Sequence, residues 1–279
     1  MEKIAWITDS SAATEKIDME DVYVVPLHII FGERSYEDRT ELSADAFYNK
    51  LSEDKEHPKT SQPALGAFIE LYKELKKSYD RGIAVHLSGA LSGTLSTSLQ
   101  AAEIAGFDVT VIDSKGASEP VLDIIRHGRA LHSDGSSLPD IRDALKSMAD
   151  RLRIYIMIDK LEQLHRGGRV SGTGKLLGQL LQIKPILAFQ NGEAIPFEKV
   201  RSRKKAQQRL IQLFTQSVEE SPVKNAHIVH ASAKEKAEQL KQELAEKYPN
   251  IVFQVRQLGP VLGVHSGSGA VGICWFDNN

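Results

Sequence analysis

Residues 82–114, GIAVHLSGALSGTLSTSLQAAEIAGFDVTVIDS, decide the fold of this chain. Residues 82–87 are mostly apolar and predict a buried strand, and residues 88–93 form a loop of glycine, serine, alanine and leucine. Residues 94–105 predict a helix, and residues 109–114 predict the next strand. A strand–helix–strand unit of this kind is typical of a parallel sheet covered by helices.

The chain on either side of this unit predicts the rest of an α/β fold. Short apolar runs predict further strands, at residues 4–7, 22–27, 153–158, 226–230, 252–255 and 270–276. Apolar residues at helical spacing predict helices, at residues 44–51, 120–132, 138–151, 203–218 and 234–247 and around Leu161 and Lys175. A hairpin or loop is predicted at residues 29–40, and a hairpin that turns at Gly192 is predicted at residues 183–200. We therefore expect two α/β domains, residues 1–150 with a mostly parallel sheet and residues 151–279 with a mixed sheet.

The composition of the chain argues against a nucleic-acid-binding, a disulfide-bonded or a membrane-spanning protein. The chain has 279 residues, 41% of them hydrophobic, and a net charge of -2, which gives no general attraction to nucleic acid. Its one cysteine, Cys274, cannot form an internal disulfide, which fits a reducing cytoplasm. The chain enters a strand at once, and no apolar run is long enough to span a membrane, so we expect neither a signal peptide nor a membrane helix.

Hydroxyl groups gather in residues 58–63, which read Pro-Lys-Thr-Ser-Gln-Pro. The apolar spacing after Pro63 predicts an amphipathic helix, with Ser61 or Gln62 as its N-cap and Thr60 just outside the positive end of the helix dipole. Hydroxyls at such a position either cap the helix or hold a carboxylate or phosphate. Capping is the simpler interpretation of these residues alone.

Two later segments carry polar groups suited to an anion. The glycine-rich loop around Ser92 opens a helix, so it forms either an anion site or a tight turn. Residues 263–269 are rich in glycine and serine and predict a loop that carries His265, whose imidazole either donates to a carboxylate or has no role. Gly174 and Lys175 lack the rest of a phosphate-binding loop, and the histidines lack metal-ligand spacing. We expect no metal and no cofactor.

Basic residues cluster in the second half of this mildly acidic chain. They are Arg166, Arg169, Arg201, Arg203, Lys204, Lys205 and Arg209. Such a cluster is either a solvated face or a landing surface for an acidic partner or a phosphate. The sequence alone leaves both interpretations open.

Taken together, these segments resemble the DegV family of bacterial fatty-acid-binding proteins. The matching segments are residues 7–11 (ITDSS), 59–63 (KTSQP), 91–94 (LSGT), 161–171 (LEQLHRGGRVS), Leu187, 201–205 and 263–267 (GVHSG). The T-S-Q-P and R-G-G-R segments in combination are far more specific than any single loop. The chain departs from the resemblance at residues 115–118, which we expect to affect the pocket wall more than the head-group contacts.

The resemblance implies two α/β domains with one long-chain fatty acid buried between them. The implied carboxylate contacts are Thr60, Ser92 and His265, with Ser61, Gly93 and Ser266 as additional candidates. Arg169 and Arg201 match a basic surface suited to passing the acid to a separate fatty acid kinase subunit. That kinase would phosphorylate the carboxylate with ATP, and the acyl phosphate would enter phospholipid synthesis. The implied protein is a cytoplasmic lipid carrier and not an enzyme, with transient contact to the membrane surface.

An alternative function from a different class stays open at this point. Ser92 and His265 would then serve a hydrolase or transferase that acts on an anionic metabolite. Against this, Ser92 is one residue out of register for the G-x-S-x-G nucleophile motif. Turnover that disappears on Ser92→Ala would favour the enzyme, whereas a co-purifying lipid would favour the carrier.

Overall fold

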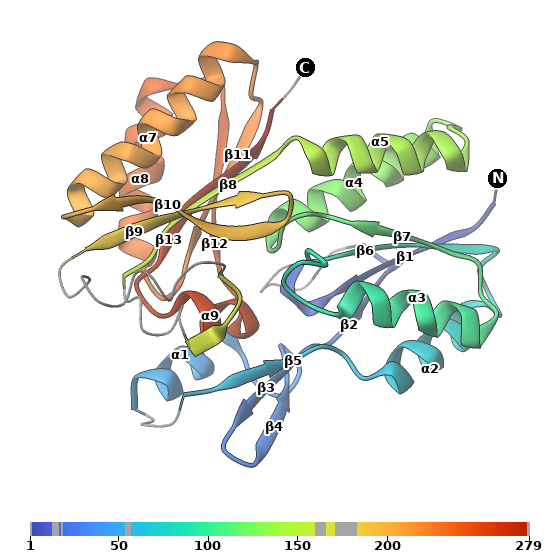
Figure 1. Cartoon of the computed structure of the whole chain (residues 1–279). Helices are drawn as coiled ribbons and strands as arrows, with labels where there is room; N and C mark the ends of the chain where they lie inside the picture. Colours follow the sequence, from blue (N-terminus) through green and yellow to red (C-terminus); the bar gives the residue numbers. More distant parts are fainter. Residues whose placement is uncertain are drawn as a thin grey trace.

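The computed structural model of the chain describes residues 2–12, 17, 19–53, 57–159, 166–170 and 183–277. These residues form a four-stranded sheet, a six-stranded sheet and a small three-stranded sheet (Figure 1). Helices alternate with strands along the chain and cover the two larger sheets. The α/β class predicted from the sequence is therefore confirmed.

The four-stranded sheet is parallel throughout. Its order is β2 (Val22–Val25), β1 (Ile4–Asp9), β6 (Arg81–His86) and β7 (Val109–Asp113). Alternate residues of a strand point to opposite faces, and both faces are apolar here. In β1, Ile4 and Trp6 pack into one buried cluster, whereas Ala5 and Ile7 pack into another.

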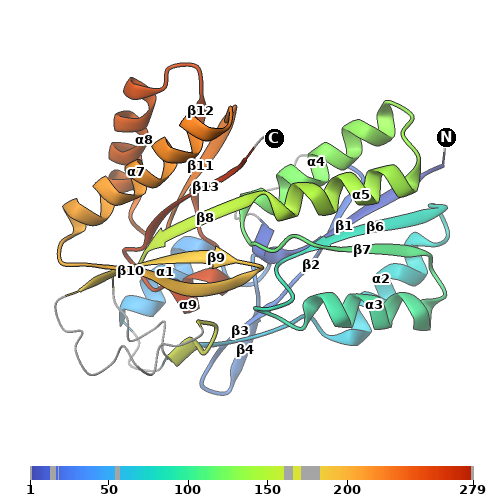
Figure 2. The same cartoon turned by 45° about the horizontal axis from the view of Figure 1, so that its top comes forward.

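Helices on both sides of this sheet explain its two apolar faces. They are α2 (Leu65–Leu75), α3 (Thr94–Ala105), α4 (Glu119–Ser133) and α5 (Leu138–Asp150). Figures 1 and 2 show α2 and α3 on one face and α4 and α5 on the other. Phe68 and Tyr72 of α2 join the cluster of Ala5, and Val121 of α4 joins the cluster of Trp6.

A small antiparallel sheet lies beside the N-terminal sheet. Its order is β4 (Arg34–Glu37), β3 (His28–Phe31) and β5 (Lys59–Ser61), and it confirms a hairpin within residues 29–40. Helix α1 (Ala44–Glu53) follows the hairpin, and Ser43 caps it by accepting a hydrogen bond from the N–H of Ala46 at 3.3 Å.

The prediction that Ser61 or Gln62 caps helix α2 is wrong. Residues 59–61 instead form β5, in which Thr60 pairs with Ile29 of β3. Helix α2 begins at Leu65 with Ala64 as an N-cap that makes no side-chain bond, and Ser61 donates to the carbonyl of Gln62. Gln62 precedes Pro63, and a residue before proline favours an extended backbone over a helical one. The backbone N–H and C=O groups of residues 59–61 find their hydrogen-bond partners in β3.

The six-stranded sheet belongs to the second half of the chain and is mixed, as predicted. Its order is β10 (Glu193–Val200), β9 (Lys184–Gln190), β8 (Leu152–Met157), β13 (Val271–Phe276), β11 (Asn225–His230) and β12 (Val252–Gln257). Only the β11–β12 pair is parallel among these described strands. Helices α7 (Arg203–Glu220) and α8 (Lys234–Lys247) cover its outer face (Figures 1 and 2).

The segment expected as a Gly/Ser-rich loop is partly helical. Helix α9 (Pro260–Ser266) begins with a proline in its first turn and ends at Gly267, whose φ is 70°. The loop prediction for residues 263–266 is therefore wrong, and His265 lies in the last turn of a helix. The prediction took Gly263 as a sign of a loop, but Gly263 lies inside the helix. A glycine is needed there for packing, because a Cβ at this position would come 2.6 Å from the ring of Phe47.

The expected domain boundary at residue 150 falls between α5 and β8, where the chain passes from one large sheet to the other. One buried cluster contains residues from both halves, including Trp6 and Ile154. The boundary itself stays a prediction. The helices expected around Leu161 and Lys175 lie outside the described residues. No helix in the described part of the chain is long and apolar enough to cross a membrane.

Candidate functional site

A cavity of about 390 Å³ lies between the two halves of the molecule. The loops that follow β6 and β7 at the carboxyl end of the parallel sheet line one side, through Leu87 and Ala117. Strands β8 to β11 and helix α9 line the other side. Open α/β sheets usually place their ligands at this carboxyl edge, and the volume is that of a small-molecule site.

Most of the wall is aliphatic or aromatic. Strand β8 contributes Ile154 and Ile156, two residues apart and therefore on one face, and β9 contributes Leu187 and Phe189 in the same way. Cys274 of β13 is also part of the wall. Burial raises the pKa of the Cys274 thiol, so it stays neutral and adds to the apolar lining, in agreement with an unreactive cysteine.

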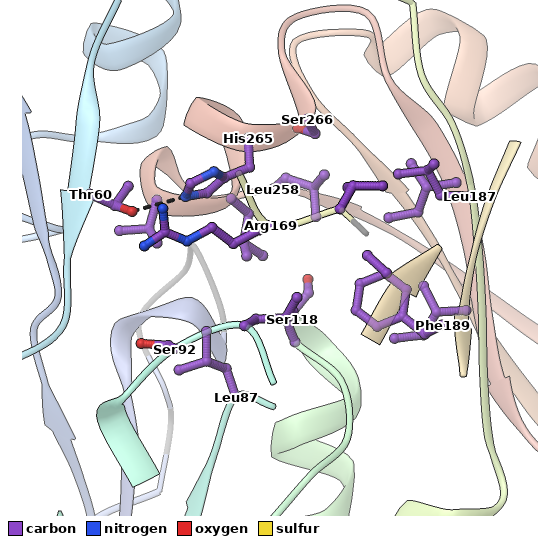
Figure 3. Close-up of a pocket in the computed structure, with 18 of the residues that line it drawn as sticks. Thr60, Leu87, Ser92, Ser118, Arg169, Leu187, Phe189, Leu258, His265 and Ser266 are labelled. Atoms are coloured by element: carbon purple, nitrogen blue, oxygen red, sulfur yellow. Dashed lines mark hydrogen bonds between the residues drawn. The ribbon is translucent and has the colours of Figure 1, made fainter. Parts of the chain in front are cut away.

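One end of the cavity carries polar side chains from distant parts of the chain. Thr60 of β5 and His265 of α9 line it together, and the Oγ1 of Thr60 lies 2.9 Å from the Nε2 of His265 (Figure 3). Ser92 lines the same cavity from the loop before α3. The three residues singled out in the sequence therefore share one cavity, and two of them are in direct contact.

His265 is neutral at physiological pH. Burial and, to a smaller extent, the nearby charge of Arg169 together lower the pKa of His265 to about 4. The Nδ1 of His265 is buried and has no hydrogen-bond partner among the described residues. A neutral imidazole carries one N–H, so Nε2 either donates to Thr60 or accepts from it.

Ser92 and Gly93 are fixed by the start of helix α3. The Oγ of Ser92 lies 2.9 Å from the Oγ1 of Thr94 and accepts a hydrogen bond from the N–H of Thr94. Gln62, which follows β5, donates to the Oγ1 of Thr97 at 2.5 Å. A Cβ on Gly93 would come 2.1 Å from the Oε1 of Gln62, so glycine allows this close approach. Gln62 thus ties the Thr60 strand to the Ser92 loop, a role that the sequence did not reveal.

The polar residues at the end of β1 and just after it stabilise the loop that carries Ser92 without lining the cavity. Asp9 is fully buried and accepts hydrogen bonds from the N–H of Leu87 at 2.9 Å and from both the N–H and the hydroxyl of Ser11. Its second oxygen also lies 3.0 Å from the Nδ1 of His86. Asp9 therefore anchors the turn that leads from β6 toward Ser92, and it is not among the residues that line the cavity.

The two arginines expected on a partner surface have different positions. Arg169 lines the cavity, and Figure 3 shows its guanidinium group drawn beside Thr60 and His265. Its Nη1 donates to the carbonyl of Gly167 at 2.8 Å. Arg201 is exposed and lies at the junction of β10 and α7, outside the cavity lining. Arg169 thus lines the cavity and Arg201 does not, and the partner surface expected at the two arginines stays a prediction.

The additional candidate contacts also differ from one another. Ser61, Gly93 and Ser266 all line the cavity, although Ser61 is largely exposed. The Oγ of Ser266 is buried and has no hydrogen-bond partner among the described residues. Ala117 and Ser118 line the cavity as well, which agrees with the expectation that residues 115–118 affect the pocket wall.

The described part of the site shows no paired nucleophile and base of the kind that the hydrolase alternative needs. Among the described hydrogen bonds, none joins Ser92 to His265: Ser92 bonds to Thr94, and His265 bonds to Thr60. The low pKa of His265 also makes it a weak base. The described residues contain no group of three His, Cys, Asp or Glu side chains that could hold a metal ion.

Comparisons with known proteins find similar sequences and similar folds. A sequence model described as "Uncharacterised protein, DegV family" matches residues 3–278. Protein DegV of Bacillus subtilis is 37% identical over 276 residues, which cover 98% of each chain. The crystal structure of DegV from Bacillus subtilis, described as a fatty acid binding protein, covers 100% of both chains with a TM-score of 0.89.

Two streptococcal structures extend the comparison. A fatty acid binding DegV family protein from Streptococcus agalactiae is 31% identical and covers 100% of both chains, with a TM-score of 0.92. The Fatty Acid Kinase (Fak) B3 protein of Streptococcus pneumoniae, loaded with linoleic acid, has a TM-score of 0.86. That chain is 17% identical and covers 99% of this one and 100% of its own length, so it shows a shared fold.

Proposed function

Because the chain belongs to the DegV family, we propose that it binds one long-chain fatty acid in the cavity between its two halves. The observation that carries the proposal is the form of this cavity: a long apolar wall with hydrogen-bonding side chains gathered at one end. A fatty acid has the same division between an apolar chain and one polar group. The proposal is also supported by relatives that are described as fatty acid binding proteins.

The carboxylate of the acid lies at the polar end in this proposal. A buried carboxylate without hydrogen-bond donors is very costly, so donors must face it. Thr60 and Ser92 supply hydroxyls, and His265 keeps Thr60 oriented through the 2.9 Å contact. The guanidinium group of Arg169 adds positive charge at the same end.

Most of the affinity comes from the tail. Each methylene removed from water contributes about 0.8 kcal/mol, so a long acyl chain outweighs the few polar contacts of its head group. The polar end then selects an acid over an alcohol or ester and fixes which end of the chain stays near the surface. Strands β8 and β9 supply the apolar face that accepts the tail.

The site suits a carrier that presents its ligand to a kinase. An oxygen of the carboxylate would attack the terminal phosphorus of ATP held by a separate kinase subunit, releasing ADP and forming an acyl phosphate. The sequence contains no phosphate-binding loop of its own. The exposed Arg201, outside the cavity, is a candidate contact for the kinase, and the fold is shared with the Streptococcus pneumoniae Fatty Acid Kinase B3 protein. Such a carrier would work in the cytoplasm.

Replacing the two hydroxyls tests the head-group assignment. We expect Thr60→Val with Ser92→Ala to weaken binding of a long-chain acid by roughly 100-fold or more, because each of the two lost hydrogen bonds to a charged group contributes about 1.5–3 kcal/mol. Binding of the methyl ester, which has no carboxylate, should change much less. Affinities are measured by titration of delipidated protein, and circular dichroism checks the fold.

The matched control is Thr60→Ser, which keeps the hydroxyl. It should bind the acid within a few-fold of the wild type. Equal affinity of the wild type and the folded double variant would contradict the head-group assignment. If gentle native mass spectrometry finds no bound acid and none can be loaded, the carrier function itself is wrong.

A further inference from the structure

The apolar cavity shares one of its walls with a second, polar hollow. This hollow has a volume of about 300 Å³, and its lining includes Lys115, Asp150, Leu152, Arg153, Phe189 and Asn191. Phe189 is also part of the lining of the apolar cavity. Among the described linings, it is the one residue that belongs to both.

Phe189 stands across the cavity from the polar head-group end. Figure 3 shows Thr60 and His265 on one side and Phe189 beyond Leu258 on the other. Phe189 lies next to the end of strand β9, which ends at Gln190. A chain anchored at Thr60 and running along β8 and β9 would therefore approach Phe189 with its methyl end.

Ionic groups occupy the far side of this wall. Lys115 pairs with Asp150, and the Nε of Arg153 lies 2.7 Å from a carboxylate oxygen of Asp277. Leu152 packs so closely against Gly116 that a Cβ there would lie 2.4 Å from its Cδ2. Leu152, which lines the polar hollow together with Phe189, is therefore closely packed.

The hairpin that carries Phe189 is fixed at its tip. The hydroxyl of Ser88, which is fully buried, donates to the carbonyl of Gly192 at 2.8 Å. Gly192 has a φ of 84°, and a Cβ on it would come 2.3 Å from the Oγ of Ser88. This contact joins the hairpin of β9 and β10 to the first half of the chain. The hairpin that carries Phe189 is thus tied to the loop after β6.

We propose that Phe189 is the end wall of the acyl site and sets the longest chain that this protein accepts. The inference rests on the proposed binding of a fatty acid. A tail that reaches Phe189 gains contact with its ring. A longer tail must displace the ring or fold back, and a tail that passes the ring meets the ionic groups around Lys115 and Arg153.

The test is a chain-length profile of delipidated protein with saturated acids of about 12 to 24 carbons. In the wild type, affinity should rise about fourfold per added methylene and then stop rising at a limiting length. Phe189→Ala removes the six ring carbons, so the limit should move up by about four carbons. Phe189→Leu, a milder change that protects the fold, should move it by a smaller amount in the same direction.

Phe197→Ala is the matched control on the same hairpin. Phe197 lies on β10 with 38% of its surface exposed, and its ring packs against Tyr155 with centroids 5.3 Å apart. It is not part of the cavity lining. The wild-type limit should persist in this variant. An equal shift in Phe197→Ala would show that loosening the hairpin, and not the wall, changes the limit, and would overturn the proposal.

A long α,ω-dicarboxylic acid gives a second measurement of the same wall. Its far carboxylate would end in apolar surroundings in the wild type, which is costly. In Phe189→Ala it would reach the hollow with Lys115 and Arg153. We expect the diacid to bind at least about tenfold more tightly to the variant than to the wild type. Equal rejection by both would overturn the role of Phe189 as the wall between the two hollows.

The profile also separates this inference from the proposed function. If the wild type and both Phe189 variants bind acids with the same length limit, Phe189 is not the end wall, although the carrier function stands. If the wild type binds no acid of any length, the carrier function is wrong, and the end-wall assignment is wrong with it.

Discussion

The hydroxyl proton of Thr60 can be given to only one acceptor at a time. If the Nδ1 of His265 carries the ring proton, Thr60 must donate its hydroxyl proton to Nε2, and Thr60 then has no proton to donate to a carboxylate. If Nε2 carries the ring proton, it donates to Thr60, and the threonine can donate to the ligand. The second tautomer is therefore the binding-competent one. Because burial and Arg169 keep His265 neutral, this choice is between two neutral forms.

Asp38 is a buried carboxyl group outside the cavity and gives the protein a pH-dependent stability. Burial raises the pKa of Asp38 from 3.8 to about 7, Asp9 adds to the rise, and the hydrogen bond from Ser10 and the charge of Arg39 oppose it. The folded state therefore holds this proton more tightly than the unfolded state. The stabilisation is present below about pH 4 and is lost as the pH rises through about 7.

Asp38→Asn should remove this component of the pH dependence. In the wild type, the component lowers the free energy of unfolding by up to about 4 kcal/mol between pH 4 and pH 8. Urea unfolding across that range measures it. Asp134→Asn, a change at an exposed position after α4, should keep the wild-type slope. A wild-type slope in Asp38→Asn would mean that Asp38 does not titrate in this range.

At the scale of elements, the basic residues near the junction of β10 and α7 are of two kinds: some form ion pairs within the fold, and others are exposed. Arg203 lies 2.7 Å from Asp159 through its Nη2 and donates to the carbonyl of Gly269. Ser202 caps α7 by accepting from the N–H of Lys205. Arg201 is exposed at the end of β10. One part of the basic cluster thus holds the fold together, and another part faces solvent.

Charge reversal at the two arginines should separate partner coupling from ligand binding. Arg201→Glu should lower phosphorylation of the bound acid by a fatty acid kinase subunit by about tenfold or more, because a charge on an interface rim mainly affects encounter. Its affinity for the acid should stay within about twofold of the wild type. Arg169→Glu should lower both quantities, because Arg169 lines the cavity. Equal losses of both in Arg201→Glu would place Arg201 in the pocket or the fold.

At the scale of the whole molecule, the cavity and the main buried cluster both draw residues from the two halves of the chain. Side chains of α4, in the first half, also form ion pairs with side chains of the six-stranded sheet, in the second half. The Nε2 of His227 lies 2.6 Å from a carboxylate oxygen of Asp123, and Arg256 lies 3.5 Å from Glu119. A ligand in the cavity therefore touches both halves at once.

We expect heat to unfold the delipidated protein in one cooperative transition, which a saturating fatty acid moves upward. At 100 times the dissociation constant, binding adds about 2.7 kcal/mol, or a rise in Tm of about 5 °C for a chain of this size. The methyl ester of the same acid should raise Tm less, because it lacks the charge that meets Arg169. Scanning calorimetry measures both. Two transitions, with only one shifted by the acid, would contradict a shared core.

The alternation of strands and helices could be predicted from the sequence, and the structure confirms the elements that depend on local apolar patterns. The helix at residues 94–105 and the strand after residue 108 occur where apolar periodicity placed them. The same local reasoning was wrong for Ser61 and for residues 263–266. There the outcome depends on β3, which pairs with β5, and on the packing of α9 against α1, both distant in sequence.

By itself, the sequence determined the α/β class and the division into parallel and mixed sheets, and it singled out Thr60, Ser92 and His265 as candidates for an anion site. Periodicity and motif chemistry are local, so they can be read along the chain. Only the tertiary structure brought Thr60 within 2.9 Å of His265 across 205 positions, moved Arg169 into the cavity lining and placed Phe189 between two hollows. Those outcomes depend on how two sheets and α9 pack together, which no local pattern specifies.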